Sequence, residues 1–86
     1  MEDSESYLIH SFPRGSAEQI QLAVRKFRGR YYIDMRVWFQ GKNSTVFRPT
    51  KKGVFFSLEH VQELRKGVEQ LASQAPRYLA LQPAGE

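Results

Sequence analysis

Residues 20–39, IQLAVRKFRGRYYIDMRVWF, decide the fold of this chain. Two runs in this stretch place an apolar side chain at every second position, which is typical of half-buried β-strands. Arg28-Gly29-Arg30 separates the runs, and its central glycine suits a tight connection that needs a positive φ. The stretch therefore predicts a β-hairpin with one apolar face, formed by Ile20, Leu22, Val24, Ile33, Met35 and Val37.

The segment after this hairpin predicts two shorter strands. Residues 41–44 and 50–53 are rich in glycine and polar residues that favour turns. Between them, residues 45–48 predict a strand that stops at Pro49, since proline cannot donate a hydrogen bond to the ladder. Residues 54–56 predict a fourth strand. Four short strands joined by brief turns indicate an antiparallel meander.

Residues 58–73 predict a single helix after the strands. Ser57 suits its N-cap, and Pro76 bounds the helix at the other end. Apolar residues recur along it with helical spacing and form one seam: Leu58, Val61, Leu64, Val68 and Leu71. The predicted fold class is therefore α+β, a four-stranded antiparallel sheet followed by one C-terminal helix. The apolar face of the sheet is expected to lie under that helix.

The length of 86 residues suits one domain, which we assign to residues 20–73. Residues 1–19 are interpreted as a partly disordered N-terminal tail and residues 74–86 as a C-terminal tail. The apolar patch at residues 7–12 could be an edge strand or could clamp against the domain. A chain this small buries only about 60% of the surface that its unfolded form exposes, so a homodimer is expected.

The composition argues against several classes of function. The chain has no cysteine, and therefore no disulfide, thiolate zinc site or catalytic thiol. His10 and His60 are too far apart for a metal site, and no nucleophile–base or carboxylate pair stands out. We therefore expect no enzyme, metal or cofactor. An acidic N-terminus and the lack of a long apolar run predict a protein of the cytoplasm (nucleoid-associated) or nucleus, neither secreted nor membrane-bound.

Positive charge and aromatic rings concentrate in residues 20–56. The whole chain has a net charge of only +4, but this segment carries nine Lys and Arg residues against Asp34 alone, a net charge of +8. The same segment holds eight of the eleven aromatic residues. Basic and aromatic residues interleaved in this way favour nucleic acid as the partner.

Strand alternation assigns much of this charge to the sheet face opposite the apolar one. The side chains expected there are Arg25, Phe27, Tyr32, Arg36 and Trp38, with Phe55 also turned outward. Single-stranded nucleic acid needs this combination, because cations neutralise phosphates and unstacked bases lie on aromatic rings. The arginines could instead simply solubilise an exposed sheet or pair with Asp34.

Four short motifs resemble those of a known family. They are Val24-Arg25-Lys26-Phe27-Arg28-Gly29-Arg30, Ile33-Asp34-Met35-Arg36, Lys51-Lys52-Gly53-Val54 and Ser57-Leu58-Glu59. In order and spacing they resemble the single-stranded-DNA-binding domain of the positive cofactor four transcriptional coactivators, a family with bacterial and phage members, over about residues 20–71. The resemblance implies a curved four-stranded antiparallel sheet followed by a helix, paired into a dimer largely through the helices. It also implies two sheet surfaces that together hold two antiparallel single strands or a melted duplex.

The resemblance also implies roles for individual residues. The aromatic contact of the family's first hairpin corresponds to Phe27, and its basic positions correspond to Arg28, Arg30, Arg36, Arg48, Lys51 and Lys52. The family's stacking tryptophan corresponds to Phe39, whereas the tryptophan of this chain is Trp38. Strict alternation favours Trp38 as the outward ring, and a bulge would favour Phe39. The family has basic residues early in the first strand, where this chain has Glu18 and Ile20. We therefore expect either weaker DNA binding at that edge or an edge that the N-terminal segment covers.

These observations predict a homodimeric, largely sequence-independent single-stranded-DNA-binding protein, acting in transcription regulation or in DNA replication, recombination or repair. Transcription or replication proteins are further expected partners. The candidate nucleic-acid contacts are Arg25, Phe27, Arg28, Arg30, Tyr32, Arg36, Trp38, Phe39, Arg48, Lys51 and Lys52, and the candidate dimer contacts are Val61, Leu64, Val68 and Leu71. The alternative is a protein-interaction module, or an RNA-binding protein, that uses the same basic aromatic face.

Overall fold

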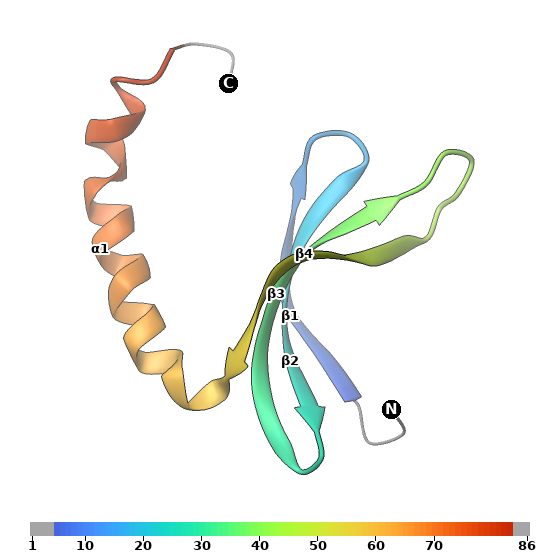
Figure 1. Ribbon diagram of the computed structural model, residues 1–86. Helices are drawn as coiled ribbons and strands as arrows, with labels where there is room; N and C mark the ends of the chain where they lie inside the picture. The colour runs from blue at the N-terminus through green and yellow to red at the C-terminus, as the bar shows by residue number, and fades with distance from the viewer. Residues whose placement is uncertain (1–4, 84–86) are drawn as a thin grey trace.

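The computed structural model describes residues 5–83, which form one antiparallel sheet followed by one long helix (Figure 1). The strands β1 (Glu5–Arg14), β2 (Glu18–Phe27), β3 (Arg30–Gln40) and β4 (Phe47–Ser57) lie in this order across the sheet. A 3₁₀ turn, η1 (Leu58–His60), leads into the helix α1 (Val61–Leu79). The sheet in Figure 1 is open and curved. The predicted α+β fold, four antiparallel strands followed by one C-terminal helix, is confirmed.

The hairpin of β2 and β3 is the one that the alternation predicts. Its register is continuous from the pair of Glu18 with Phe39 to the pair of Phe27 with Arg30. Arg28 and Gly29 form the turn, with φ values of 54° and 78°. Two consecutive positive φ values characterise the type I′ turn, whose twist matches that of the strands it joins. Because the register is unbroken, successive side chains of both strands keep to alternate faces of the sheet.

β1 corrects the interpretation of residues 1–19 as a tail and confirms the alternative of an edge strand at residues 7–12. It pairs antiparallel with β2 and forms one edge of the sheet. The register shifts between Leu8 and His10, so Tyr7 and Phe12 both lie opposite apolar residues of β2 despite their odd separation. A β-bulge of this kind interrupts the period of two along a strand. The interruption explains why alternation did not identify β1 in the sequence.

β4 corrects the prediction of two separate strands at residues 45–48 and 54–56. A single strand passes through the predicted turn at residues 50–53 and contains Pro49. β4 forms an edge of the sheet, which is the position where a strand tolerates proline. The predicted turn is therefore a bulge within a continuous strand.

The bulge places three residues of β4, numbered 50–52, opposite the single residue Val37 of β3. Thr50 Oγ1 donates a hydrogen bond to the Val37 carbonyl oxygen at 2.8 Å and accepts one from the Lys52 amide at 3.1 Å. Arg36 Nη1 donates to the Thr50 carbonyl oxygen at 2.9 Å. These bonds replace ladder bonds that the extra residues cannot form.

Gly53 marks the point at which β4 rejoins the regular ladder, opposite Arg36. A Cβ atom added at Gly53 would overlap Arg36 Cβ and lie 2.5 Å from the Met35 carbonyl oxygen. The two backbones therefore approach as closely as they do only because this residue has no side chain.

The helical segment begins as predicted but has a different first turn. The Ser57 hydroxyl oxygen accepts a hydrogen bond from the Glu59 amide at 3.2 Å, which confirms Ser57 as an N-cap. The turn that it caps is η1, and α1 starts at Val61. The predicted helix at residues 58–73 is thus a short 3₁₀ turn followed by a longer α-helix.

The end of α1 corrects the prediction that Pro76 bounds the helix. The helix continues to Leu79 with Pro76 inside it. Proline removes one N–H donor, but the Pro76 carbonyl oxygen still accepts the Ala80 amide at 3.1 Å, which supports the last turn. Much of the predicted tail at residues 74–86 is therefore helical. Residues 1–4 and 84–86 of the two predicted tails lie outside the described residues.

The core of the described chain is thin. Its buried apolar residues are Ile33 and Val37, both on β3. No residue of α1 is buried, and Figure 1 shows α1 standing apart from the sheet. Met35 and Val54 of the apolar face are exposed. The expectation that the helix covers this face is therefore wrong within a single chain.

Candidate nucleic-acid interface

One face of the sheet, which we call the polar face, carries Arg25, Tyr32, Asp34, Arg36, Trp38 and Phe55. The cross-strand pairs establish this grouping, because Arg25 lies opposite Tyr32 and Asp34 lies opposite Phe55. An open cavity of about 430 Å³ lies on the polar face. Its lining residues are Ser6, Gln21, Ala23, Arg25, Asp34, Arg36, Trp38, Pro49, Thr50 and Lys51.

A buried carboxylate organises the centre of the polar face. Asp34 Oδ2 accepts a hydrogen bond from Arg25 Nη1 at 2.9 Å, and Asp34 Oδ1 accepts one from Arg36 Nε at 2.7 Å. The Asp34 side chain is only 6% exposed, whereas Arg25 and Arg36 are 35% and 20% exposed. The three side chains together carry a net charge of +1. The two arginines are thus both paired with Asp34 and accessible from the cavity.

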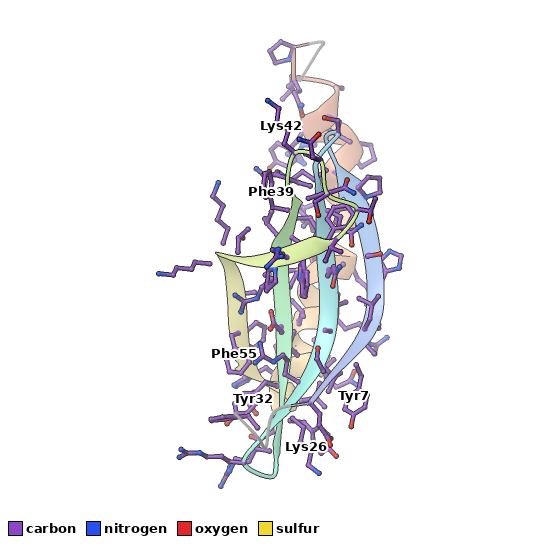
Figure 2. The ribbon with its side chains drawn as sticks, turned by 90° about the vertical axis from the view of Figure 1, so that its right-hand side faces the viewer. Tyr7, Lys26, Tyr32, Phe39, Lys42 and Phe55 are labelled. Atoms are coloured by element: carbon purple, nitrogen blue, oxygen red, sulfur yellow. The ribbon has the colours of Figure 1, made fainter. Side chains whose placement is uncertain are left out.

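Aromatic rings cluster at the hairpin end of the polar face. Tyr32 and Phe55 stack with ring centroids 4.6 Å apart and an angle of 18° between their planes. Figure 2 shows these two rings together near the end of the sheet that carries Lys26. The Arg25 guanidinium carbon lies 5.6 Å from the Phe55 ring centroid. Alternation placed Phe55 outward, but only its contacts with Tyr32 and Arg25 assign it to the site.

Trp38 lines the cavity beside Arg36, at the other end of the polar face. Within residues 5–83 its ring has no aromatic or cation–π partner. The bulge lies in β4 and leaves the alternation of β3 intact, so Phe39 projects to the opposite face, where it lies opposite Arg48. Phe39 is 45% exposed and lies toward the Lys42 turn in Figure 2. Of the two candidate stacking rings, Trp38 is the one within the cavity.

The β2–β3 turn carries three more of the predicted contacts. Phe27 shares the alternation of Arg25, and the Arg28 guanidinium carbon lies 5.1 Å from the Phe27 ring centroid. Arg30 lines a second open cavity of about 650 Å³, which also contacts Tyr31, Tyr32 and the start of the helical segment. The hairpin end of the sheet is thus basic and aromatic, as expected.

The basic residues of β4 are divided between the two faces. Lys51 lines the cavity of the polar face. Lys52 instead lines a groove of about 460 Å³ on the apolar face, beside Val54 and Met35. Arg48 lies opposite Phe39 and so shares its side of the sheet. Tertiary structure therefore brings Lys51 together with Arg36 and Trp38, but does not bring Lys52, Arg48 or Phe39 to that cavity.

The apolar seam of α1 is exposed to solvent. Val61, Val68 and Leu71 are 40%, 52% and 67% exposed, and Leu64 is partly buried. The groove on the apolar face of the sheet is also uncovered, and its lining includes Phe12, Ile20, Met35, Val37 and Val54. Exposed apolar side chains that gather on one surface are typical of interaction sites.

Two further features are absent from residues 5–83. No helix in this range is long and apolar enough to cross a membrane. The same part of the chain contains no group of three or more His, Cys, Asp or Glu side chains that could hold a metal ion.

Comparisons with known proteins identify related sequences and folds. Residues 16–67 match the family described as Transcriptional Coactivator p15 (PC4). The bacteriophage T5 homologue of the eukaryotic coactivator PC4, which is implicated in recombination-dependent DNA replication, is 30% identical to this chain; the match has a TM-score of 0.63 and covers 86% of this chain and 82% of the phage protein. A PC4 homologue from Burkholderia pseudomallei, solved in two crystal forms, is 26% identical, with TM-scores of 0.69 and 0.70. That match covers 80% of this chain and 98% or 90% of the bacterial chain. No curated protein sequence matches significantly.

Proposed function

The chain belongs to the Transcriptional Coactivator p15 (PC4) family, and from this premise we propose that it is a homodimeric protein that binds single-stranded DNA largely without regard to sequence. Arginine and lysine side chains of the polar face would neutralise the phosphates, and aromatic rings would stack on the bases. The proposed stacking residues are Phe27 and Trp38.

One observation carries this proposal: Trp38, Arg36 and Lys51 line a single open cavity on a sheet face that also holds Arg25. A ring that has no aromatic or cation–π partner among residues 5–83, next to cations that remain accessible, offers both contacts that a single strand requires. A duplex would instead need a helix or ribbon shaped for a groove. Arg28 and Arg30 would extend the cationic surface toward the hairpin end. Lys52, Arg48 and Phe39 remain predicted contacts, although they project to the other side of the sheet.

The dimer is proposed from the surface that one chain leaves uncovered. The radius of gyration is 15.5 Å, against about 12 Å for a compact chain of this length. The accessible surface is 7195 Å², against about 5,200 Å² for a compact monomer of this mass. The excess is the size of one partner's share in an obligate homodimer interface. The seam of Val61, Leu64, Val68 and Leu71 is proposed as the centre of the interface.

The cellular role is proposed from the same family membership. The phage T5 homologue is implicated in recombination-dependent replication, and the family description names transcriptional coactivation. We place this chain in DNA transcription, replication, recombination or repair, in the nucleoid or nucleus. In each of these processes DNA strands separate and expose the bases that the polar face would bind.

The test is a titration of fluorescently labelled oligo-dT and of a duplex of equal length, with the oligomer mass measured alongside. We expect a dimer that prefers the single strand. If six phosphates are neutralised on one strand, log K against log salt has a slope of roughly −4. Equal affinity for the duplex, or a slope near zero, would contradict the proposal.

The same titration separates the alternatives. An RNA oligonucleotide of matched sequence that binds more tightly than the DNA would reassign the face to RNA. A protein-interaction module would give no binding to either oligonucleotide, and oligo-dT would not displace its protein partner.

A further inference from the structure

Asp34 is a buried acid at the centre of a face that otherwise carries positive charge. It is 5% exposed as a whole residue, and both of its carboxylate oxygens accept hydrogen bonds from arginine. Burial of a carboxylate is costly unless the charge is paired. Here the partners are Arg25 from β2 and Arg36 from β3 itself, so one side chain ties two strands together.

The contact with Asp34 determines the direction in which Arg36 points. Its Nε donates to Asp34 Oδ1 and its Nη1 donates to the Thr50 carbonyl oxygen, so the planar guanidinium is held at two points. A guanidinium has five N–H donors, and those two contacts leave three of them for a ligand. Thr50 and Lys51 both belong to the bulge, so the same network orients the segment that carries the next cation of the cavity.

Arg25 is held in a similar way on the other side of Asp34. Its Nη1 donates to Asp34 Oδ2, and its guanidinium lies over the Phe55 ring, which stacks on Tyr32. Asp34 thus connects the aromatic pair at one end of the polar face to the bulge near Trp38 at the other.

We propose that Asp34 is a positioning residue, which holds Arg25 and Arg36 in the orientation that binds the phosphates of single-stranded DNA. This proposal rests on the proposed function of the polar face. Long cationic side chains lose rotamer freedom when they bind a ligand, and prior immobilisation removes that cost. An acid in the middle of a DNA-binding face would then strengthen binding rather than weaken it.

Electrostatics alone predicts the opposite, namely that loss of the Asp34 charge strengthens DNA binding. Replacement of Asp34 by a neutral residue raises the net charge of the cluster from +1 to +2, which by itself favours a polyanion. An asparagine has one acceptor oxygen, so its amide nitrogen would face one of the two guanidinium groups as donor against donor. Positioning therefore predicts weaker binding for Asp34→Asn, and charge alone predicts tighter binding.

The experiment measures oligo-dT affinity and its salt dependence for four proteins: wild type, Asp34→Asn, Glu18→Gln and Arg36→Lys. Glu18→Gln is the charge-matched control, since Glu18 lies on β2, pairs with Arg14 at 3.5 Å and shares with Phe39 the face of the sheet opposite to Arg25 and Arg36. Arg36→Lys keeps the charge but lacks the planar fork that reaches two acceptors at once. Thermal unfolding and mass measurements establish which variants are folded dimers.

We expect Asp34→Asn to raise the Kd by about tenfold and to make the salt slope shallower by about 0.7 for each phosphate that is no longer neutralised. Glu18→Gln is expected to bind at least as tightly as the wild type. Arg36→Lys is expected to bind more weakly although its charge is unchanged. If Asp34→Asn only lowered the stability of the protein, the folded fraction would bind oligo-dT with the salt slope of the wild type.

Asp34→Asn binding as tightly as the wild type or more so, with a slope unchanged or steeper, would overturn the positioning role. An equal loss of affinity in Glu18→Gln would overturn it too, because the effect would not be specific to Asp34. If Asp34→Asn does not fold, Arg36→Lys decides, and wild-type affinity in that variant rejects the proposal. Failure of the wild type to bind oligo-dT would instead reject the proposed function itself.

Discussion

The two faces of the sheet differ in how far their side chains find partners within the chain. On the polar face Asp34 accepts hydrogen bonds from Arg25 and Arg36, and the Thr50 hydroxyl donates to the Val37 carbonyl oxygen of β3. On the apolar face Met35 and Val54 stay exposed, and α1 stands away from the sheet. Both faces come from the same strands, because neighbouring residues point to opposite sides.

The difference separates the apolar surface that we propose to lie in a dimer from the polar surface that we propose to bind DNA. Exposed apolar surface is unfavourable in water wherever it is not covered. The polar face can remain in contact with solvent when no ligand is bound. We therefore expect mutations on the apolar side and in its seam to act on assembly, and mutations on the polar face to act on DNA.

The largest effect is expected from a charge in the helical seam. Val68→Asp would place an unpaired carboxylate in the proposed dimer interface, where its desolvation opposes association. We expect the dimer dissociation constant to rise at least hundredfold, about 3 kcal/mol, as measured by sedimentation velocity. Gln70→Asp adds the same charge on the other side of α1 and is expected to leave the dimer intact. A dimer of unchanged affinity in Val68→Asp would show that the seam of α1 is not part of the dimer interface.

A substitution at Gly53 should damage both faces together, because a side chain there would overlap the backbone of β3. The added methyl would meet Arg36 Cβ and the Met35 carbonyl, neither of which can move without the sheet. We expect Gly53→Ala to lower the free energy of unfolding by about 3 kcal/mol, measured by chemical denaturation.

Gly67→Ala is the matched control for that measurement. Within one chain, a Cβ at Gly67 meets no atom from outside its own stretch of helix backbone within 4 Å, and alanine favours a helix interior by roughly 1 kcal/mol relative to glycine. The control is expected to be slightly stabilised. Equal free energies of unfolding in the two variants would mean that the sheet does not need the close backbone approach at Gly53.

The smallest and most selective effect is expected from two adjacent aromatic residues. Trp38→Ala should weaken oligo-dT binding by about 1–3 kcal/mol with the dimer and its thermal stability intact. Phe39→Ala, one residue further along β3, should change DNA affinity far less, because its ring projects to the other face. Anisotropy titration of both variants checks this. A larger loss of affinity in Phe39→Ala would assign base stacking to Phe39 and to the opposite face of the sheet.

Sequence reasoning was most successful where a pattern extends over neighbouring residues. The β2–β3 hairpin, its two faces and the N-cap at Ser57 depend on local alternation and local hydrogen bonds, and all three agree with the structure. Part of the site was predictable in the same way. Asp34 and Arg36 are two residues apart on a strand and must share a face, so their contact was open to inference from the sequence.

The failures occurred where distant segments decide the conformation. Leu8 to His10 form a bulge only because β2 offers a partner, and the bulge hides the strand pattern of the N-terminal segment. The segment at residues 50–53 has the composition of a turn, yet its polar groups bond to β3 and the strand continues. Pro76 failed for a local reason instead, since the helix passes a residue that usually ends one and the Pro76 carbonyl oxygen still accepts the Ala80 amide.

Residue spacing alone predicts an antiparallel sheet with one apolar and one cationic, aromatic face, because period-two alternation is a local property of the backbone. Three further features follow only from contacts between strands: β1 completes the sheet, Lys51 and Lys52 lie on opposite faces, and Asp34 is buried between two arginines. Those outcomes depend on register and on close backbone approach between strands that are far apart in sequence. Cross-strand hydrogen bonds and steric contacts, rather than residue spacing, select among the arrangements that the same alternation allows.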